Sequence, residues 1–126
     1  MLIRLDAADP RPIYMQIMDE VRRARVLGTL AADEPLPSVR QLAAELRINP
    51  NTVAQAYREL EREGVVHVRR GHGTFLNPDA VNGAERRALA RGVAERAMRD
   101  ARRHGLDLDD LVAALRALPA RLREGA

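Results

Sequence analysis

Asn51, Thr52 and Gln55 lie within one five-residue segment, at the start of a stretch with helical periodicity. The amides of asparagine and glutamine can pair bidentately with adenine, and threonine can bond a base edge or place its methyl group on thymine. A helix N-terminus also favours a phosphate, because its partial charge is positive. The three side chains therefore fit contact with DNA bases, although Asn49 to Thr52 alone fit simple helix capping equally well.

Arginine side chains stand on both sides of this segment. Arg40, in the preceding helical stretch, is placed for contact with a phosphate or a guanine. Further along the chain, a basic turn of the kind that closes a hairpin contains Arg69, Arg70, Gly71 and His72. Glycine lets the backbone approach a groove closely, and an arginine can enter the minor groove. A basic turn alone is usually a solvated loop, so this one gains its weight from the polar helix before it.

Catalysis and metal binding find little support in the residues. The three histidines are scattered, and no serine, histidine and carboxylate have a spacing typical of nucleophilic catalysis. Asp107, Asp109 and Asp110 cluster, but an acidic N-cap and first helical turn explain them better than a metal site does. The chain has no lysine for a cofactor Schiff base and no cysteine for thiolate chemistry. We expect no catalytic residue, no cofactor and no metal.

Length and composition predict one small domain with an appendage. The chain has 126 residues, 46% of them apolar but only 2% aromatic, which predicts an aliphatic, mainly helical core. The net charge of +3 and the high pI favour a nucleic-acid partner only modestly. All the basic residues are arginines, and their high pKa inflates the pI. No apolar run approaches the roughly 20 residues that span a bilayer, and the first residues form no secretory segment. We therefore expect a cytoplasmic protein without membrane contact.

Three helices are predicted to position the polar residues. The first follows Pro12 and ends near Gly28, and its inner face holds Ile13, Ile17, Val21, Ala24 and Leu27. Ser38 caps a short second helix, with Gln41 completing a capping box. Asn49 caps a third helix, which Pro50 opens and which runs to about Glu63; its inner face holds Val53, Ala56, Tyr57 and Leu60. Two short helices joined by a tight turn match a helix-turn-helix, whose second helix enters the major groove.

A hairpin and two further helices are predicted after the third helix. Alternation in residues 65–69 predicts a strand, and residues 74–76 predict its partner, with Phe75 filling the space between the ribbon and the helices. Residues 85–104 and the stretch from Leu108 onwards have helical periodicity, with Pro119 kinking or ending the latter. The predicted fold is mainly α, with a winged helix-turn-helix at residues 1–77 and a two-helix dimerisation tail at residues 78–126.

The run LPSVRQLAAELRINPNTVAQAYRELEREGVVHVRRGHGTF, residues 36–75, resembles the signature of the GntR family of bacterial regulators. The upstream residues Pro12, Ile13, Tyr14, Gln16 and Ile17 agree with it, and the likeness covers about residues 10–77. The resemblance implies DNA contacts by Arg40, Asn51, Thr52, Arg70 and Gly71. It also places Tyr57 within reach of a phosphate, with a core role as the alternative. Arg47 and Asp33 stand where the family usually has glycine.

The short tail is similar to that of the YtrA-type branch of the family, in which the tail is chiefly a dimerisation device. The resemblance then implies a repressor, often of a neighbouring transporter operon. Because one recognition helix makes too few base contacts for operator specificity, we expect a homodimer on a palindromic duplex. A small-molecule effector is left unknown, because no polar constellation in the sequence names one. The dimer contacts predicted in the tail are Leu89, Val93, Leu108, Leu111, Leu115 and Leu118. Two alternatives remain: intramolecular packing of the leucine stripe, and a winged-helix protein-interaction module without specific DNA binding.

Overall fold

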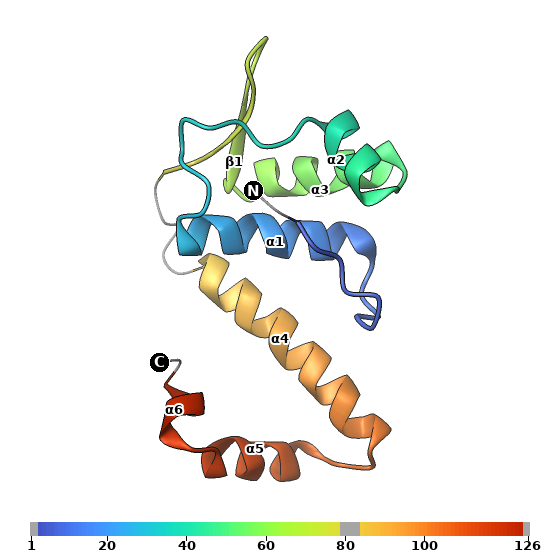
Figure 1. Ribbon diagram of the computed structural model, residues 1–126, viewed down its shortest axis with the longest axis vertical. Helices are drawn as coiled ribbons and strands as arrows, with labels where there is room; N and C mark the ends of the chain where they lie inside the picture. Colours follow the sequence, from blue (N-terminus) through green and yellow to red (C-terminus); the bar gives the residue numbers. More distant parts are fainter. Residues whose placement is uncertain (1–2, 79–83, 125–126) are drawn as a thin grey trace. The chain divides into compact units, whose positions relative to one another are not determined.

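The computed structural model describes residues 3–78 and 84–124. In chain order the elements are α1 (Ile13–Leu27), α2 (Val39–Leu46), α3 (Pro50–Arg62), β1 (Val66–Arg69), β2 (Gly73–Leu76), α4 (Ala84–Arg103), α5 (Leu108–Ala117) and α6 (Ala120–Arg123) (Figure 1). They fall into two compact units, Met1–Ala90 and Arg91–Ala126. The mainly helical fold with a two-stranded wing is confirmed.

The core of the first unit lies among its first three helices. α3 packs against both α1 and α2. The largest fully buried side chains are aliphatic: Ile17, Val21, Leu42, Val53, Leu60 and Val66. The predicted inner face of α3 is confirmed at all four positions. Burial of each large aliphatic side chain stabilises the fold by about 1.5–3 kcal/mol, so apolar packing contributes strongly to holding α3 against α1 and α2.

The predicted helix caps are present. The Ser38 hydroxyl accepts the backbone N–H of Gln41 at 3.1 Å, and the Gln41 side chain accepts the backbone N–H of Ser38 at 3.0 Å. The Asn49 side chain accepts the backbone N–H of Asn51 at 2.8 Å. Gly28 ends α1 with φ +69°, a left-handed conformation that favours glycine. The sequence therefore marks the ends of these helices through side-chain chemistry.

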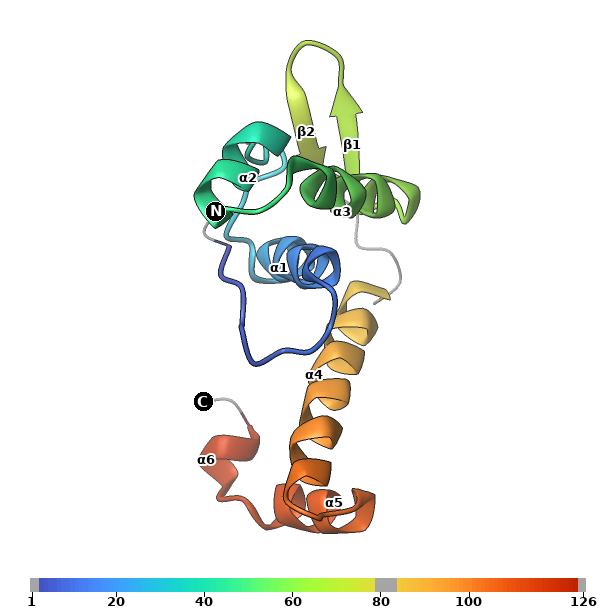
Figure 2. The ribbon, with the colours of Figure 1, turned by 90° about the vertical axis from the view of Figure 1, so that its right-hand side faces the viewer.

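The wing is an antiparallel hairpin that extends beyond the helices (Figure 2). Arg69 pairs with Gly73, so β2 begins one residue earlier than predicted and the turn consists of residues 70–72. The segment before α2 joins the hairpin from the other side, since the Leu36 N–H donates to the Thr74 carbonyl at 2.7 Å and Pro35 forms a bridge with Phe75. Backbone contacts therefore join the hairpin to the segment that leads into α2.

Three apolar residues that the periodicity predicts to be buried are exposed: Ile13 by 37%, Leu27 by 61% and Val68 by 56%. Ile13 and Leu27 are the terminal residues of α1. Val68 lies two residues beyond the buried Val66, towards the turn of the hairpin. Burial therefore does not alternate along β1: Val66 is buried, His67 is half-buried, and Val68 and Arg69 are exposed.

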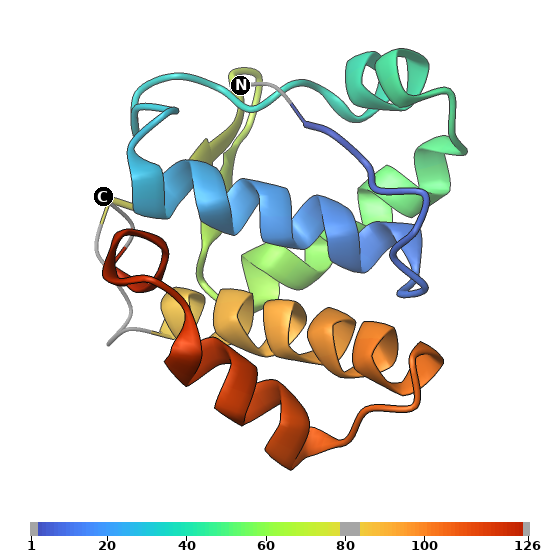
Figure 3. The same cartoon turned by 60° about the horizontal axis from the view of Figure 1, so that its bottom comes forward.

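The polar segment before α1 is part of the folded domain. Arg11 pairs with Asp9 at 2.8 Å and with Asp19 at 2.7 Å, and both Asp9 and Arg11 are buried. The hydrogen bond to Asp9, followed by that to Asp19, raises the pKa of Arg11. Gln16 accepts the backbone N–H of Asp6 at 2.9 Å and ties the segment to the first turn of α1 (Figure 3). Because the buried charges are paired, this polar stretch can pack closely.

Further ion pairs join elements of the first unit. Arg22 of α1 binds Glu63 at 2.7 Å and Asp19 at 3.1 Å. Arg25 binds Glu85, in the first turn of α4, at 2.6 Å, and both side chains are more than nine-tenths buried. The start of α4 is therefore held to α1 by a buried pair, and breaking such a pair is costly.

The second unit contains most of α4 together with α5 and α6. Gly105, with φ +74°, follows α4, and the Leu106 N–H donates to the Ala101 carbonyl at 2.9 Å. Asp107 caps α5 by accepting the backbone N–H of Asp110 at 2.9 Å, and this bond lowers the pKa of Asp107. The last predicted helix is divided before Pro119, which precedes α6. The capping role predicted for the acidic cluster is therefore confirmed at Asp107.

Candidate nucleic-acid interface

The first turn and a half of α3 presents polar side chains to solvent. Asn51 and Gln55 are exposed and Thr52 is half-buried, while Val53 and Ala56 of the same helix face the core. Because α3 is held to α1 and α2 by its buried face, the opposite face is rigidly presented. The arrangement brings together two amides and one hydroxyl, which is the chemistry needed to pair with base edges in a major groove.

The first backbone amides of α3 are already bonded within the protein. The Asn51 N–H donates to the Asn49 side chain at 2.8 Å, and the Thr52 N–H donates to the Asn49 carbonyl at 3.0 Å. These two groups are the ones that a phosphate at a helix N-terminus would otherwise use. Contacts with an anion at this end must therefore come mainly from side chains.

Two exposed arginines precede α3 in the chain. Arg40 lies in the first turn of α2, and Arg47 forms the turn between α2 and α3. Within the described residues, neither guanidinium takes part in an ion pair. Arg47 has φ +57° and ψ +48°, a left-handed conformation that is uncommon for residues with a Cβ. The sequence identified Arg47 only as a missing glycine, whereas its exposed cation makes it a candidate phosphate contact. Asp33, by contrast, does not have a positive φ, so its turn does not require glycine.

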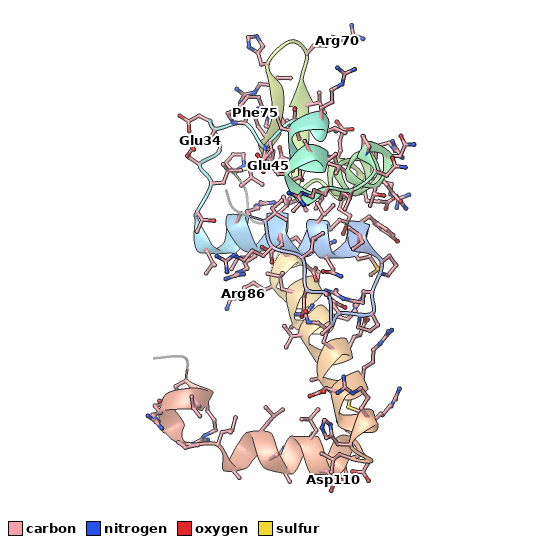
Figure 4. All side chains as sticks on the ribbon, turned by 45° about the vertical axis from the view of Figure 1, so that its right-hand side comes forward. Glu34, Glu45, Arg70, Phe75, Arg86 and Asp110 are labelled. Carbon is pink, nitrogen blue, oxygen red and sulfur yellow. The ribbon has the colours of Figure 1, made fainter. Side chains whose placement is uncertain are left out.

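The tip of the wing carries two freely exposed basic side chains. Arg70 points outward at the end of the ribbon (Figure 4), and His72 is also exposed in the same turn. Gly71 between them has φ +79°, which only glycine adopts easily. The tip therefore presents a cation on a narrow backbone, a form that can enter a groove.

Arg69 and His67, at the base of the wing turn, are held by neighbours. The Arg69 guanidinium lies over the Phe75 ring at 4.4 Å, and its Nε donates to His67 Nε2 at 3.2 Å. His67 Nδ1 forms a hydrogen bond with the side-chain oxygen of Asn77. The side-chain amide nitrogen of Asn77 donates to the Gly64 carbonyl. Phe75 is buried as predicted, but beneath Arg69 and beside His67. The pairing of His67 with Asn77 could not be predicted from the sequence, because it depends on the hairpin register.

Tyr57 lies in the core, which is the alternative to a phosphate contact that the sequence leaves open. Its side chain is buried in the core, and its hydroxyl donates to the Pro37 carbonyl at 2.6 Å. Burial, with a smaller contribution from Glu45, raises the pKa of Tyr57. The hydroxyl therefore holds the segment that leads into α2, and Tyr57 supports the interface from behind.

The net positive charge is not concentrated in the helix-turn-helix. Residues 3–78 contain 11 arginines and 10 acidic residues, whereas α4 alone contains seven arginines and three acidic residues. Attraction of the first unit to a phosphate backbone must therefore come from local placement of a few exposed arginines, because its overall charge is almost balanced.

The six residues predicted for dimerisation include several that are exposed. Val93, Leu108 and Leu115 are each more than half exposed, Leu118 is 37% exposed, and Leu89 and Leu111 are half-buried. Three apolar residues of α5 are among them, and no residue of α5 is fully buried. Solvent-facing leucines on one short helix are unfavourable in an isolated chain, so they are candidates for an interface.

Two other kinds of functional feature are absent from the described segments. In the described segments, no group of three or more His, Cys, Asp or Glu side chains is arranged to hold a metal ion. None of the described helices combines the length and the apolar character needed to cross a bilayer.

Comparisons with known proteins agree with this geometry. Residues 13–76 match the family of bacterial regulatory proteins, gntR family. The chain belongs to the GntR family. It is 42% identical over 79 residues to the HTH-type transcriptional repressor YtrA of Bacillus subtilis, and this match covers 63% of the chain and 61% of that repressor. The chain thus spans about three fifths of the length of this curated relative.

Two solved structures extend the comparison. A GntR family transcriptional regulator from Listeria monocytogenes is similar with a TM-score of 0.64 and 30% identity, covering 91% of this chain and 100% of that chain. The AraR DNA-binding domain, solved in complex with operator ORR3, has a TM-score of 0.52 and 22% identity, covering 61% of this chain and 93% of that one. The second likeness shows a shared fold only.

Proposed function

We propose that the protein is a transcriptional repressor that binds a palindromic DNA operator as a homodimer. The observation that carries this proposal is the outward face at the start of α3, which groups Asn51, Thr52 and Gln55 while the opposite face of the helix is buried. Membership of a family of bacterial regulatory proteins supports it. Repression is the activity named for the similar YtrA protein. Control of a transporter operon is the expectation that the family resemblance adds for this chain.

The side chains divide into base-reading and backbone-positioning groups. In the proposed complex, Asn51, Thr52 and Gln55 read base edges in the major groove. Arg40 and Arg47 bind phosphates and fix the approach of α3. At the wing, the turn formed by Arg70, Gly71 and His72 enters the adjacent minor groove. The negative potential of a narrow minor groove attracts the cation there.

The helical tail, residues 78–126, serves in this proposal as the dimerisation element. Its exposed leucines would be covered by the same residues of a second copy, as two-fold symmetry requires. Two recognition helices held at a fixed distance then read two half-sites, which gives the specificity that one helix lacks.

Selection of bound sequences from a random duplex pool tests the proposal. Purified protein is used to enrich duplexes over several rounds, and the enriched duplex is titrated against salt beside a random duplex of equal length. We expect an inverted repeat, bound about 10³-fold or more tightly than random DNA at physiological salt. Asn51→Ala provides a matched control, since it should lose preference for the repeat while keeping most affinity for random DNA.

Absence of enrichment by a folded dimer would contradict the proposal. An equal loss of affinity on cognate and random duplexes in Asn51→Ala would remove the base-reading role of that residue. A protein that enriches nothing and shows no salt-dependent binding would instead favour a winged-helix module that contacts proteins.

A further inference from the structure

The guanidinium of Arg69 is occupied on two sides by the wing itself. Its flat face lies on the Phe75 ring at 4.4 Å, and its Nε group donates to His67 Nε2 at 3.2 Å. The side chain remains exposed, and among the described residues the edge formed by its two terminal nitrogens has no hydrogen-bond or ion-pair partner. Because that edge is the part that binds a phosphate bidentately, Arg69 is oriented before any ligand arrives.

The hydrogen bonds around His67 define its protonation. Nε2 accepts from Arg69, so this nitrogen carries no proton. Nδ1 then carries the proton and donates to Asn77 Oδ1, while the Asn77 amide donates to the Gly64 carbonyl. Each donor meets an acceptor along this chain only when the imidazole is neutral.

We propose that His67 is a positioning residue that holds Arg69 ready for a phosphate of the operator. The proposal rests on the DNA-binding function proposed above. Arg70 at the tip is unrestrained, whereas Arg69 loses little conformational freedom on binding because Phe75 and His67 have already fixed it. Asn77 supports the arrangement from outside the hairpin by fixing the imidazole.

The test measures what Arg69 contributes to binding in three backgrounds. Affinity for the enriched duplex is determined with and without Arg69→Gln in the wild-type chain, in His67→Gln and in His67→Phe, under one set of solution conditions. His67→Gln keeps an acceptor near the Nε2 position, whereas His67→Phe removes the acceptor. Thermal unfolding of each variant verifies that the wing domain is folded.

We expect Arg69→Gln to weaken binding about tenfold in the wild type and in His67→Gln, but only two- to threefold in His67→Phe. A loss that is the same in every background, or no loss in the wild type, overturns the positioning role. Failure of the wild type to enrich any duplex overturns the proposed function itself, so the two failures are distinguishable.

Discussion

Replacement of Arg47 by glycine should make the protein more stable and weaken its binding to DNA. Arg47 has φ +57° and ψ +48°, and for a residue with a Cβ this conformation costs roughly 1–2 kcal/mol. Glycine removes that cost but has more freedom in the unfolded chain, which offsets about 0.5–1 kcal/mol. The side chain is exposed, so little packing is lost. The free energy of unfolding should rise by about 1 kcal/mol, which corresponds to about 4 °C in Tm.

Thermal and urea unfolding followed by far-ultraviolet circular dichroism measure this change, with Arg47→Ala as the matched control. Alanine removes the cation but keeps the Cβ, so its stability should stay within about 0.5 kcal/mol of the wild type. Both variants should lower the salt slope of operator binding by about 0.9, as the loss of one phosphate contact requires. A glycine variant no more stable than the alanine variant would refute the reasoning about backbone strain.

Three further predictions concern α3, the Asp107 cap of α5 and the proposed dimer. Asn51→Ala should lose about 1–3 kcal/mol of affinity for the enriched duplex, measured by fluorescence anisotropy, and an unchanged affinity would contradict base contact. The backbone N–H of Asp110 lowers the pKa of Asp107 in the folded state. The stability that the Asp107 cap gives to α5 is therefore fully present above the unfolded-state pKa of about 3.9, and it is lost as the pH falls through the folded-state pKa. Helicity should therefore decline less on acidification in Asp107→Asn; identical acid profiles would argue against this role. Leu115→Asp should convert a dimer to monomers in analytical ultracentrifugation, and a persistent dimer would place the interface elsewhere.

Much of the helix-turn-helix follows from local chemistry in the sequence. Ser38 and Asn49 mark two helix starts because their side chains bond amides that a helix leaves unpaired, and these signals need no tertiary information. The inner face of α3 follows equally well, since a helix held between two others must bury a continuous stripe.

Features that depend on distant neighbours could not be predicted. The burial of Asp9 and Arg11 requires Asp19 of α1 to complete the charge balance, so the segment appears in the sequence as an ordinary polar lead-in. The pairing of His67 with Asn77 depends on hairpin register and on the return of the chain past Gly64. Sequence pattern gives the kind of surface each element carries, while contacts between separate segments are set by three-dimensional packing.

Titration of the enriched duplex, intact and with one half-site scrambled, tests the central claim most directly. A homodimer that reads an inverted repeat through two copies of α3 should bind the intact duplex with two chains and lose at least about tenfold in affinity when one half-site is scrambled. Equal affinity for the intact and the scrambled duplex would contradict it, because binding would then come from the phosphate backbone alone.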